Sequence, residues 1–127
     1  MCSSAHGEYI GVDAKSKVLQ AKNRIDGEYM NGELSIEGLA NECGVSQVYF
    51  RKIFRSIYHM APTEYITAVR LKNAERLMLH TSFTLDECAL RCGFSSVSYF
   101  CRVFKSRYGI SPARYRKENS VTSNSII

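Results

Sequence analysis

The 127-residue chain lacks the sequence features of several large protein classes. It has five cysteines but no Cys-x-x-Cys pair, and its histidines, His6, His59 and His80, are scattered, so the spacing of a closed zinc site is missing. It has no signal peptide and no apolar run long enough to cross a bilayer. Free thiols in such a chain predict a reducing, cytoplasmic environment.

Catalytic motifs are missing as well. The sequence contains no glycine-rich phosphate loop, no convincing nucleophile–base set and no pair of acids in a setting that would tune their protonation. It therefore predicts a protein that is not an enzyme and that carries no cofactor and no metal.

Acidic residues are absent from two stretches of the chain, although the net charge is only +5. The first stretch, between Glu42 and Glu64, contains three cations, and the second, between Glu87 and Glu118, contains seven. These cations are Arg51, Lys52 and Arg55, followed by Arg91, Arg102, Lys105, Arg107, Arg114, Arg116 and Lys117. A solvated helix face normally mixes both signs of charge, so this segregation predicts a polyanionic partner.

What the chain does contain is an internal repeat. Part of it recurs 49 positions later and the rest 50 positions later, because the second copy carries one extra residue. The identical pairs are Ala40/Ala89, Cys43/Cys92, Gly44/Gly93, Ser46/Ser95 and Val48/Val97, then Tyr49/Tyr99, Phe50/Phe100, Phe54/Phe104, Ser56/Ser106, Tyr58/Tyr108, Pro62/Pro112 and Tyr65/Tyr115. Such self-similarity predicts one supersecondary unit used twice.

Each copy predicts a helix, a tight turn and a second helix. In the first copy Ser35 caps a helix over 36–43, Gly44 supplies the turn, and Ser46 caps the second helix. The same roles fall in the second copy to Thr84, 85–92, Gly93 and Ser95. A small residue four positions before the glycine, followed by an amphipathic helix, is typical of a helix-turn-helix. A helical hairpin duplicated only for stability is the alternative, and the segregated charge argues against it.

Residues 93–116, GFSSVSYFCRVFKSRYGISPARYR, closely resemble the signature of AraC/XylS-type bacterial transcription regulators, and residues 44–55, GVSQVYFRKIFR, form a weaker copy. The resemblance extends over roughly residues 15–117. It implies an all-α fold with two helix-turn-helix subdomains joined by a long linker helix, about seven helices in all. It also implies an activator that places two recognition helices in successive major grooves of promoter DNA and acts on RNA polymerase. Longer members of the family carry an effector or dimerisation domain.

The coarse map of the chain fits that plan. We expect an N-terminal tail over 1–14, a first helix-turn-helix subdomain over 15–61, a linker helix over 62–81, a second subdomain over 82–119 and a disordered tail over 120–127. The helix that opens the first subdomain is expected over 15–30, with one apolar face made of Val18, Ala21, Ile25 and Tyr29.

The outward residues of the second helix in each copy are the candidates for DNA contact, because that helix enters the major groove. The predicted base contacts are Gln47, Val48, Arg51, Lys52, Val97, Ser98 and Arg102. The predicted phosphate contacts are Ser46, Arg55, Ser96, Lys105 and Arg107. Ser98 is also a candidate for a phosphate. Only Arg102 is a strong base reader in the second copy, so the second lobe is predicted to be the less selective.

The cysteines leave two further questions open. Cys43, Cys88 and Cys92 fall at inward apolar positions and are predicted to be packed free thiols, whereas Cys101 aligns with the outward-facing Arg51. A DNA-repair methyl acceptor with an AraC-like module would need an activated or zinc-bound cysteine, for which the sequence gives no support. The other alternative is a helical protein-interaction module whose basic face meets an acidic partner.

Overall fold

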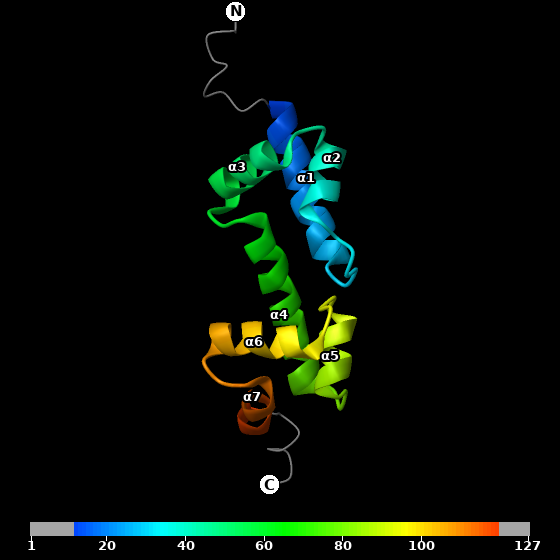
Figure 1. Ribbon diagram of the computed structural model, residues 1–127, viewed down its shortest axis with the longest axis vertical. Helices are drawn as coiled ribbons and strands as arrows, with labels where there is room; N and C mark the ends of the chain where they lie inside the picture. Colours follow the sequence, from blue (N-terminus) through cyan, green and yellow to red (C-terminus); the bar gives the residue numbers. More distant parts are fainter. Residues whose placement is uncertain (1–11, 120–127) are drawn as a thin grey trace, which may run out of the picture. The chain divides into compact units, whose positions relative to one another are not determined.

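The computed structural model describes residues 12–119, which form helices and no strands (Figure 1). The helices are α1 (Val12–Glu28), α2 (Ile36–Cys43), α3 (Gln47–Tyr58), α4 (Pro62–His80), α5 (Leu85–Arg91), α6 (Val97–Tyr108) and α7 (Pro112–Asn119). The predicted all-α fold of about seven helices is confirmed. The helix α1 begins at Val12, three residues before the predicted start. Residues 1–11 and 120–127, where most of the predicted tails fall, lie outside the described range.

The described chain divides into two compact units. Unit 1 contains α1, α2, α3 and the first turn of α4, up to Ile66. Unit 2 contains α4 from Thr67 onward, the helices α5, α6 and α7, and the short segment Tyr29–Gly32. The predicted linker helix α4 therefore supplies residues to the cores of both units.

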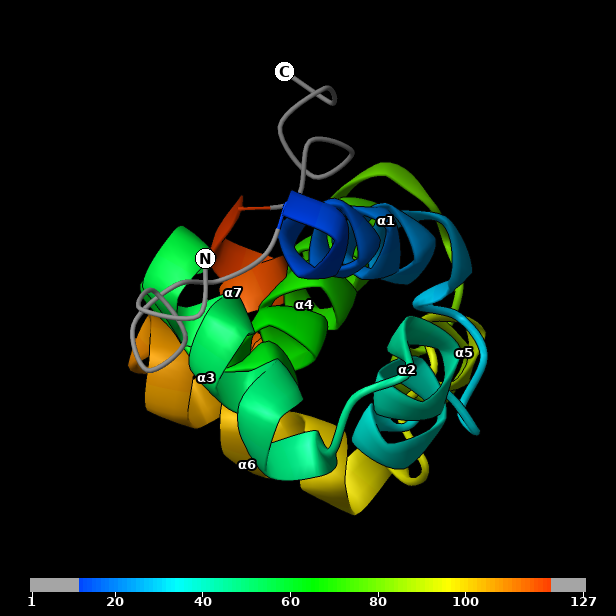
Figure 2. The same ribbon diagram turned by 90° about the horizontal axis from the view of Figure 1, so that it is seen from above.

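Unit 1 is a helix-turn-helix packed on α1. Seen from above, α1 lies on one side of this unit and α2 and α3 on the other (Figure 2), and all three helices contact one another. The turn forms as predicted: Ser46 Oγ accepts a hydrogen bond from the Tyr49 amide at 3.1 Å, and Gly44 adopts φ +70°. The buried residues of unit 1 are Val18, Ala21, Ile25, Ile36, Leu39, Ala40, Cys43, Phe50, Ile53, Phe54, Pro62 and Ile66.

Unit 2 repeats this arrangement with α4 in the place of α1. The helix α6 runs across the C-terminal half of α4 and contacts α5 and α7 (Figure 1). Thr84 and Glu87 form a capping box at the start of α5, in which each side chain binds the other residue's amide. The buried cluster consists of Leu71, Ala74, Met78, Cys88, Ala89, Cys92, Phe94, Phe100 and Phe104.

An aromatic group closes each unit. In unit 1, Phe54 packs against Tyr58 and Tyr65, and the Tyr65 hydroxyl donates to Asp26 Oδ1 of α1 at 2.6 Å. The helix pair α1 and α3 is thereby tied to the first turn of α4. Lys22 pairs with the same Asp26 carboxylate at 2.7 Å.

The same group recurs in unit 2, where Tyr108 and Tyr115 pack against Phe104 and donate their hydroxyls to Glu75 of α4. Burial raises the pKa of Tyr108 to about 12, and the hydrogen bond to Glu75 raises the pKa of Tyr115 to about 12. Glu75 follows Asp26 by 49 residues, the spacing of the repeat. The repeated unit therefore begins further upstream than the sequence comparison indicated, with α4 equivalent to α1 and α7 equivalent to the first turn of α4.

The structure corrects the register of the repeat at the recognition helices. Ser96, and not Ser95, caps α6, because its side chain accepts from the Tyr99 amide at 3.1 Å, as Ser46 accepts from the Tyr49 amide. The extra residue of the second copy thus lies in the turn before the helix. Val97 then takes the position of Gln47, and Ser98 takes the position of Val48.

The segment after α1 also differs from the expectation. The helix ends at Glu28, so Tyr29 does not extend the apolar face of α1 and instead packs against the core of unit 2. Arg70 holds this segment, donating from Nε to the Tyr29 carbonyl and from Nη2 to the Asn31 carbonyl, both at 2.8 Å. Partial burial lowers the pKa of Arg70.

The C-terminal caps of α3 and α6 offer a stability test. His59 adopts φ +62° at the end of α3, where the second copy has Gly109 at φ +87°. A left-handed backbone costs roughly 1–2 kcal/mol for a residue with a Cβ atom. We expect His59→Gly to raise the free energy of unfolding by about 1 kcal/mol and Gly109→Ala to lower it by a similar amount. Urea denaturation measures both changes, and a loss of stability in His59→Gly would contradict the expectation.

Candidate nucleic-acid interface

The helix α3 presents one buried face and one exposed basic face. Its inward residues Phe50, Ile53 and Phe54 are fully buried, since apolar side chains recur at the spacing of one helix face. The predicted contact residues of α3 are all exposed: Gln47, Val48, Arg51, Lys52 and Arg55. Val48 is 75% exposed, so its side chain is accessible to a partner. Gln47 Oε1 accepts from Arg51 Nη2 at 3.4 Å, so these side chains lie together on the outer face.

The helix α6 is built in the same way. Phe100 and Phe104 are buried, and Ser98, Arg102 and Lys105 are exposed. The Arg102 guanidinium lies over the Tyr99 ring, 5.2 Å from its centroid. Arg107, near the end of the helix, is exposed as well.

Val97 is placed differently from the other predicted base contacts. It is half-buried and packs against the core of unit 2. The corrected register accounts for this, because the extra turn residue places Ser98 where α3 has Val48. Ser98 therefore presents a small hydroxyl on the outer face of α6 in place of an apolar side chain.

The predicted phosphate contacts fall into two kinds. Ser46 and Ser96 are exposed N-caps whose hydroxyl oxygens already accept from a backbone amide of their own helix. Each hydroxyl hydrogen remains available to donate to a phosphate oxygen. Arg55, Lys105 and Arg107 are exposed cations.

The ion pairs of the described chain lie away from α3 and α6. They join Lys17 to Asp13, Lys22 to Asp26, Arg24 to Glu28 and Glu42, and Arg114 to Glu118. Within residues 12–119, no carboxylate lies within 4.0 Å of a cationic nitrogen of α3 or α6. Neither helix contains an acidic residue. The cations of these two helices are thus exposed and uncompensated, which suits a polyanion.

Three cations of the acid-free stretch 88–117 are engaged within the protein. Arg91 stacks on the Phe83 ring at 4.2 Å, Arg114 pairs with Glu118 at 2.9 Å, and Arg116 donates to the Thr81 carbonyl at 2.7 Å. These contacts leave fewer cations for a partner than the sequence alone indicated.

The described cysteines are free thiols, as predicted. Cys43, Cys88 and Cys92 are buried, and burial raises the pKa of each thiol, that of Cys92 to about 11. Cys101 is half-exposed on α6, and burial, together with the charge of Asp86, raises its pKa too. A raised pKa keeps each sulfur in its unreactive thiol form at neutral pH.

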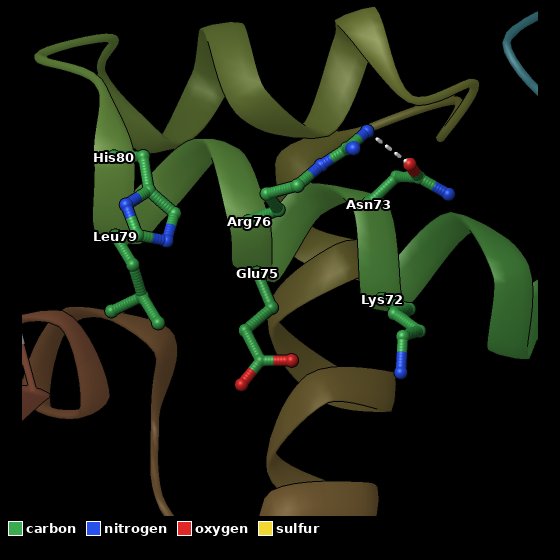
Figure 3. Close-up of a pocket in the computed structure, with 6 residues that line it drawn as sticks. All are labelled: Lys72, Asn73, Glu75, Arg76, Leu79 and His80. Atoms are coloured by element: carbon green, nitrogen blue, oxygen red, sulfur yellow. Dashed lines mark hydrogen bonds between the residues drawn. The ribbon is translucent and has the colours of Figure 1, made fainter.

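A groove of about 400 Å³ lies along the C-terminal half of α4 (Figure 3). Its lining residues are Lys72, Asn73, Glu75, Arg76, Leu79 and His80. The Glu75 carboxylate is occupied by the two tyrosine hydroxyls of the closing aromatic group, and the Arg76 guanidinium donates to the Asn73 amide oxygen.

No helix in the described part of the chain has the length and apolarity needed to cross a membrane. Between residues 12 and 119, no three His, Cys, Asp or Glu side chains come together as metal ligands.

The sequence matches a protein-family model described as a helix-turn-helix domain over residues 39–118. The regulatory protein PocR of Salmonella typhimurium is 29% identical over 109 residues, which cover 86% of this chain and 36% of PocR. The virulence regulon transcriptional activator VirF of Yersinia enterocolitica is 28% identical over 95 residues, 75% of this chain and 35% of VirF. The chain therefore spans about a third of the length of these relatives.

Solved structures resemble the chain over most of their own length. The C-terminal domain of AraT, a response regulator from Geobacillus stearothermophilus, has a TM-score of 0.79 at 28% identity and covers 83% of this chain and 87% of that domain. The DNA-binding domain of AdpA, a global transcriptional factor, was solved in complex with a target DNA. It has a TM-score of 0.76 at 29% identity, and the match covers 80% of this chain and 90% of that domain.

Proposed function

Because this chain belongs to the helix-turn-helix domain family of the AraC type, we propose that it binds promoter DNA sequence-specifically and regulates transcription through the exposed faces of α3 and α6. The observation that carries the proposal is the absence, within residues 12–119, of any carboxylate paired with the cations of these two helices. Most of the other cations pair, stack or bond within the protein, whereas the two helices that would enter a major groove contain no acidic residue of their own.

The side chains of α3 supply the chemistry for reading bases. The guanidinium of Arg51 and the ammonium of Lys52 donate to guanine O6 and N7, Gln47 reads adenine, and Val48 meets a thymine methyl. In α6 the base reader is Arg102, with Ser98 beside it and Val97 at the margin. Because the two helices carry different side chains, the two half-sites differ in sequence and the site is not a palindrome.

The remaining exposed groups position the protein on the DNA backbone. We assign Ser46, Arg55, Ser96, Lys105 and Arg107 to phosphate oxygens, where such contacts add affinity without sequence information. Lys117 of α7 is also exposed and adds to the positive surface of unit 2.

The salt dependence of binding tests this function. With Arg91, Arg114 and Arg116 engaged inside the protein, seven of the ten cations remain for the DNA surface, and each one that neutralises a phosphate releases condensed counterions. We expect a plot of log K against log salt to have a slope of about −5, measured by fluorescence anisotropy on a labelled duplex. A slope shallower than about −2 would contradict DNA binding, and equal affinity for an acidic peptide would favour the protein-interaction alternative.

The regulatory role extends the proposal to partners. The name of VirF describes it as a transcriptional activator, and we propose activation through contact with RNA polymerase for this chain too. We further propose that an effector or dimerisation domain is a partner of this domain, since the chain spans about a third of the length of its relatives. We also propose a role in the cytoplasm without catalysis. The raised pKa of the buried thiols argues against the methyl-acceptor alternative, because that chemistry requires a thiolate.

A further inference from the structure

The stacked pair Tyr99–Arg102 on α6 has no counterpart on α3. The equivalent residues of unit 1 are Tyr49 and Lys52, and the cation–ring contacts found within residues 12–119 involve Arg91 and Arg102 but not Lys52. Arg51, the other cation on this part of α3, is held instead by the Gln47 side chain at 3.4 Å. The candidate base-contacting arginine is therefore held by a hydrogen bond to a side chain in α3 and by stacking on an aromatic ring in α6.

Tyr99 is held in place by two contacts. Its backbone amide is fixed by Ser96 Oγ, and its ring lies 6.1 Å from the ring of Phe94, which is only 3% exposed. Tyr99 itself is 37% exposed, so its ring contacts the core and is also accessible at the surface of α6. The Arg102 guanidinium lies over this ring, 5.2 Å from its centroid.

Stacking on an aromatic ring restricts a flexible arginine without occupying its donors. A guanidinium over a ring keeps its N–H groups pointing outward from the edge of its plane, the edge that forms a bidentate contact with guanine O6 and N7. A long side chain that is already ordered loses less conformational entropy when it binds. Within residues 12–119 no carboxylate competes for Arg102, so the ring is its defined partner in the free protein.

We infer that Tyr99 is a specificity-determining positioning residue that orients Arg102 toward a guanine in the half-site of unit 2. The inference rests on the proposed DNA-binding function and deepens it. It assigns sequence selectivity to α6, which by side-chain chemistry alone looks the weaker reader.

The test compares base preference in the wild type, Tyr99→Leu, Tyr99→Phe and Arg102→Ala. A duplex selected from a random pool provides the site, and competition with all four bases at each position gives the preference. We expect Arg102→Ala to abolish the preference for guanine at one base pair and Tyr99→Leu to reduce it about threefold to tenfold. Tyr99→Phe, which keeps the ring, restores the preference. In the double variant Tyr99→Leu/Arg102→Ala, the first change has no further effect on this preference.

Three measurements separate positioning from a general loss of structure. A structural defect would weaken all sequences alike, whereas the slope of log K against log salt and the affinity for random duplex should stay unchanged in Tyr99→Leu. The matched control is Tyr49→Leu in unit 1, which removes a ring at the equivalent position but no stacked cation, and so should leave the preferences of the unit 1 half-site unchanged. Thermal unfolding by circular dichroism reports whether each variant folds.

The possible outcomes are distinct. Full guanine preference in Tyr99→Leu, or in Arg102→Ala, would overturn the role of the stacked pair while leaving the DNA-binding function intact. If the wild type showed no sequence preference in either half-site, the proposed function itself would fail, and the positioning role with it.

Discussion

Gly93→Ala is expected to lower the free energy of unfolding by about 3 kcal/mol or more. Gly93 has φ +96°, and a Cβ atom there would lie 2.3 Å from the Tyr29 carbonyl oxygen and 2.8 Å from Arg70 Nε. Neither neighbour can move aside freely, because Arg70 Nε donates to that same carbonyl. The added methyl group would therefore break a buried contact besides straining the turn.

The internal repeat supplies the matched control. Gly44 occupies the same position in unit 1 with φ +70°, but a Cβ atom there would meet nothing within 4 Å. Gly44→Ala should lose only the cost of a left-handed backbone, about 1 kcal/mol. Urea denaturation of the two variants gives the comparison. Equal losses would mean that the approach of Tyr29 and Arg70 to Gly93 is loose in solution.

Arg51→Ala should produce the largest change in DNA recognition. Loss of a bidentate contact with guanine costs about 1–3 kcal/mol, or roughly fivefold to 150-fold in affinity for the preferred duplex. Affinity for random duplex should fall only slightly, since one cation among about seven is removed. Anisotropy titrations on the selected duplex and on a duplex with that base pair changed measure both effects.

Two variants bracket this prediction. Arg51→Lys keeps the charge but not the planar pair of donors, so it should lose most of the base preference and little of the salt dependence. Lys105→Ala, on the exposed face of α6, should weaken all duplexes alike. A changed base preference in Lys105→Ala together with an unchanged one in Arg51→Ala would reverse the assigned roles.

The sequence was sufficient to predict the helices because their end signals are local. Serine and threonine caps, the positive-φ glycines and the two prolines each act on neighbouring backbone, so Ser35, Gly44 and Pro62 mark their boundaries without help from tertiary contacts. The capping box at Thr84 and Glu87 follows the same logic, and its spacing is visible in the sequence.

Local signals could not predict which serine caps α6 and therefore how the second turn aligns with the first. Ser95 and Ser96 are adjacent, and either is a suitable cap by chemistry. The choice depends on Phe94, which is buried and lies 5.1 Å from the ring of Phe100, so that packing of the core places the extra residue before the helix. The same choice moved Val97 toward the core and brought Ser98 outward.

The extent of the repeat was hidden for a related reason. Asp26 and Glu75 differ in side-chain length, and the helices around them share little sequence, so identity alone gives no signal there. Their common role appears only when the tyrosine hydroxyls from far along the chain, Tyr65 in unit 1 and Tyr115 in unit 2, are seen to donate to them. Long-range pairing of this kind is a tertiary property.

Because α4 belongs to both units, it affects how the chain folds and where the chain can be cut. Two complete four-helix units would need eight helices. The described chain forms both with seven, because the single continuous helix α4 contributes its first turn to unit 1 and the rest of its length to unit 2. Unfolding of α4 in either core removes hydrogen bonds from the segment on which the other core depends. We therefore expect that no cut between Pro62 and His80 leaves two intact halves, and that the two units fold cooperatively through this single helix.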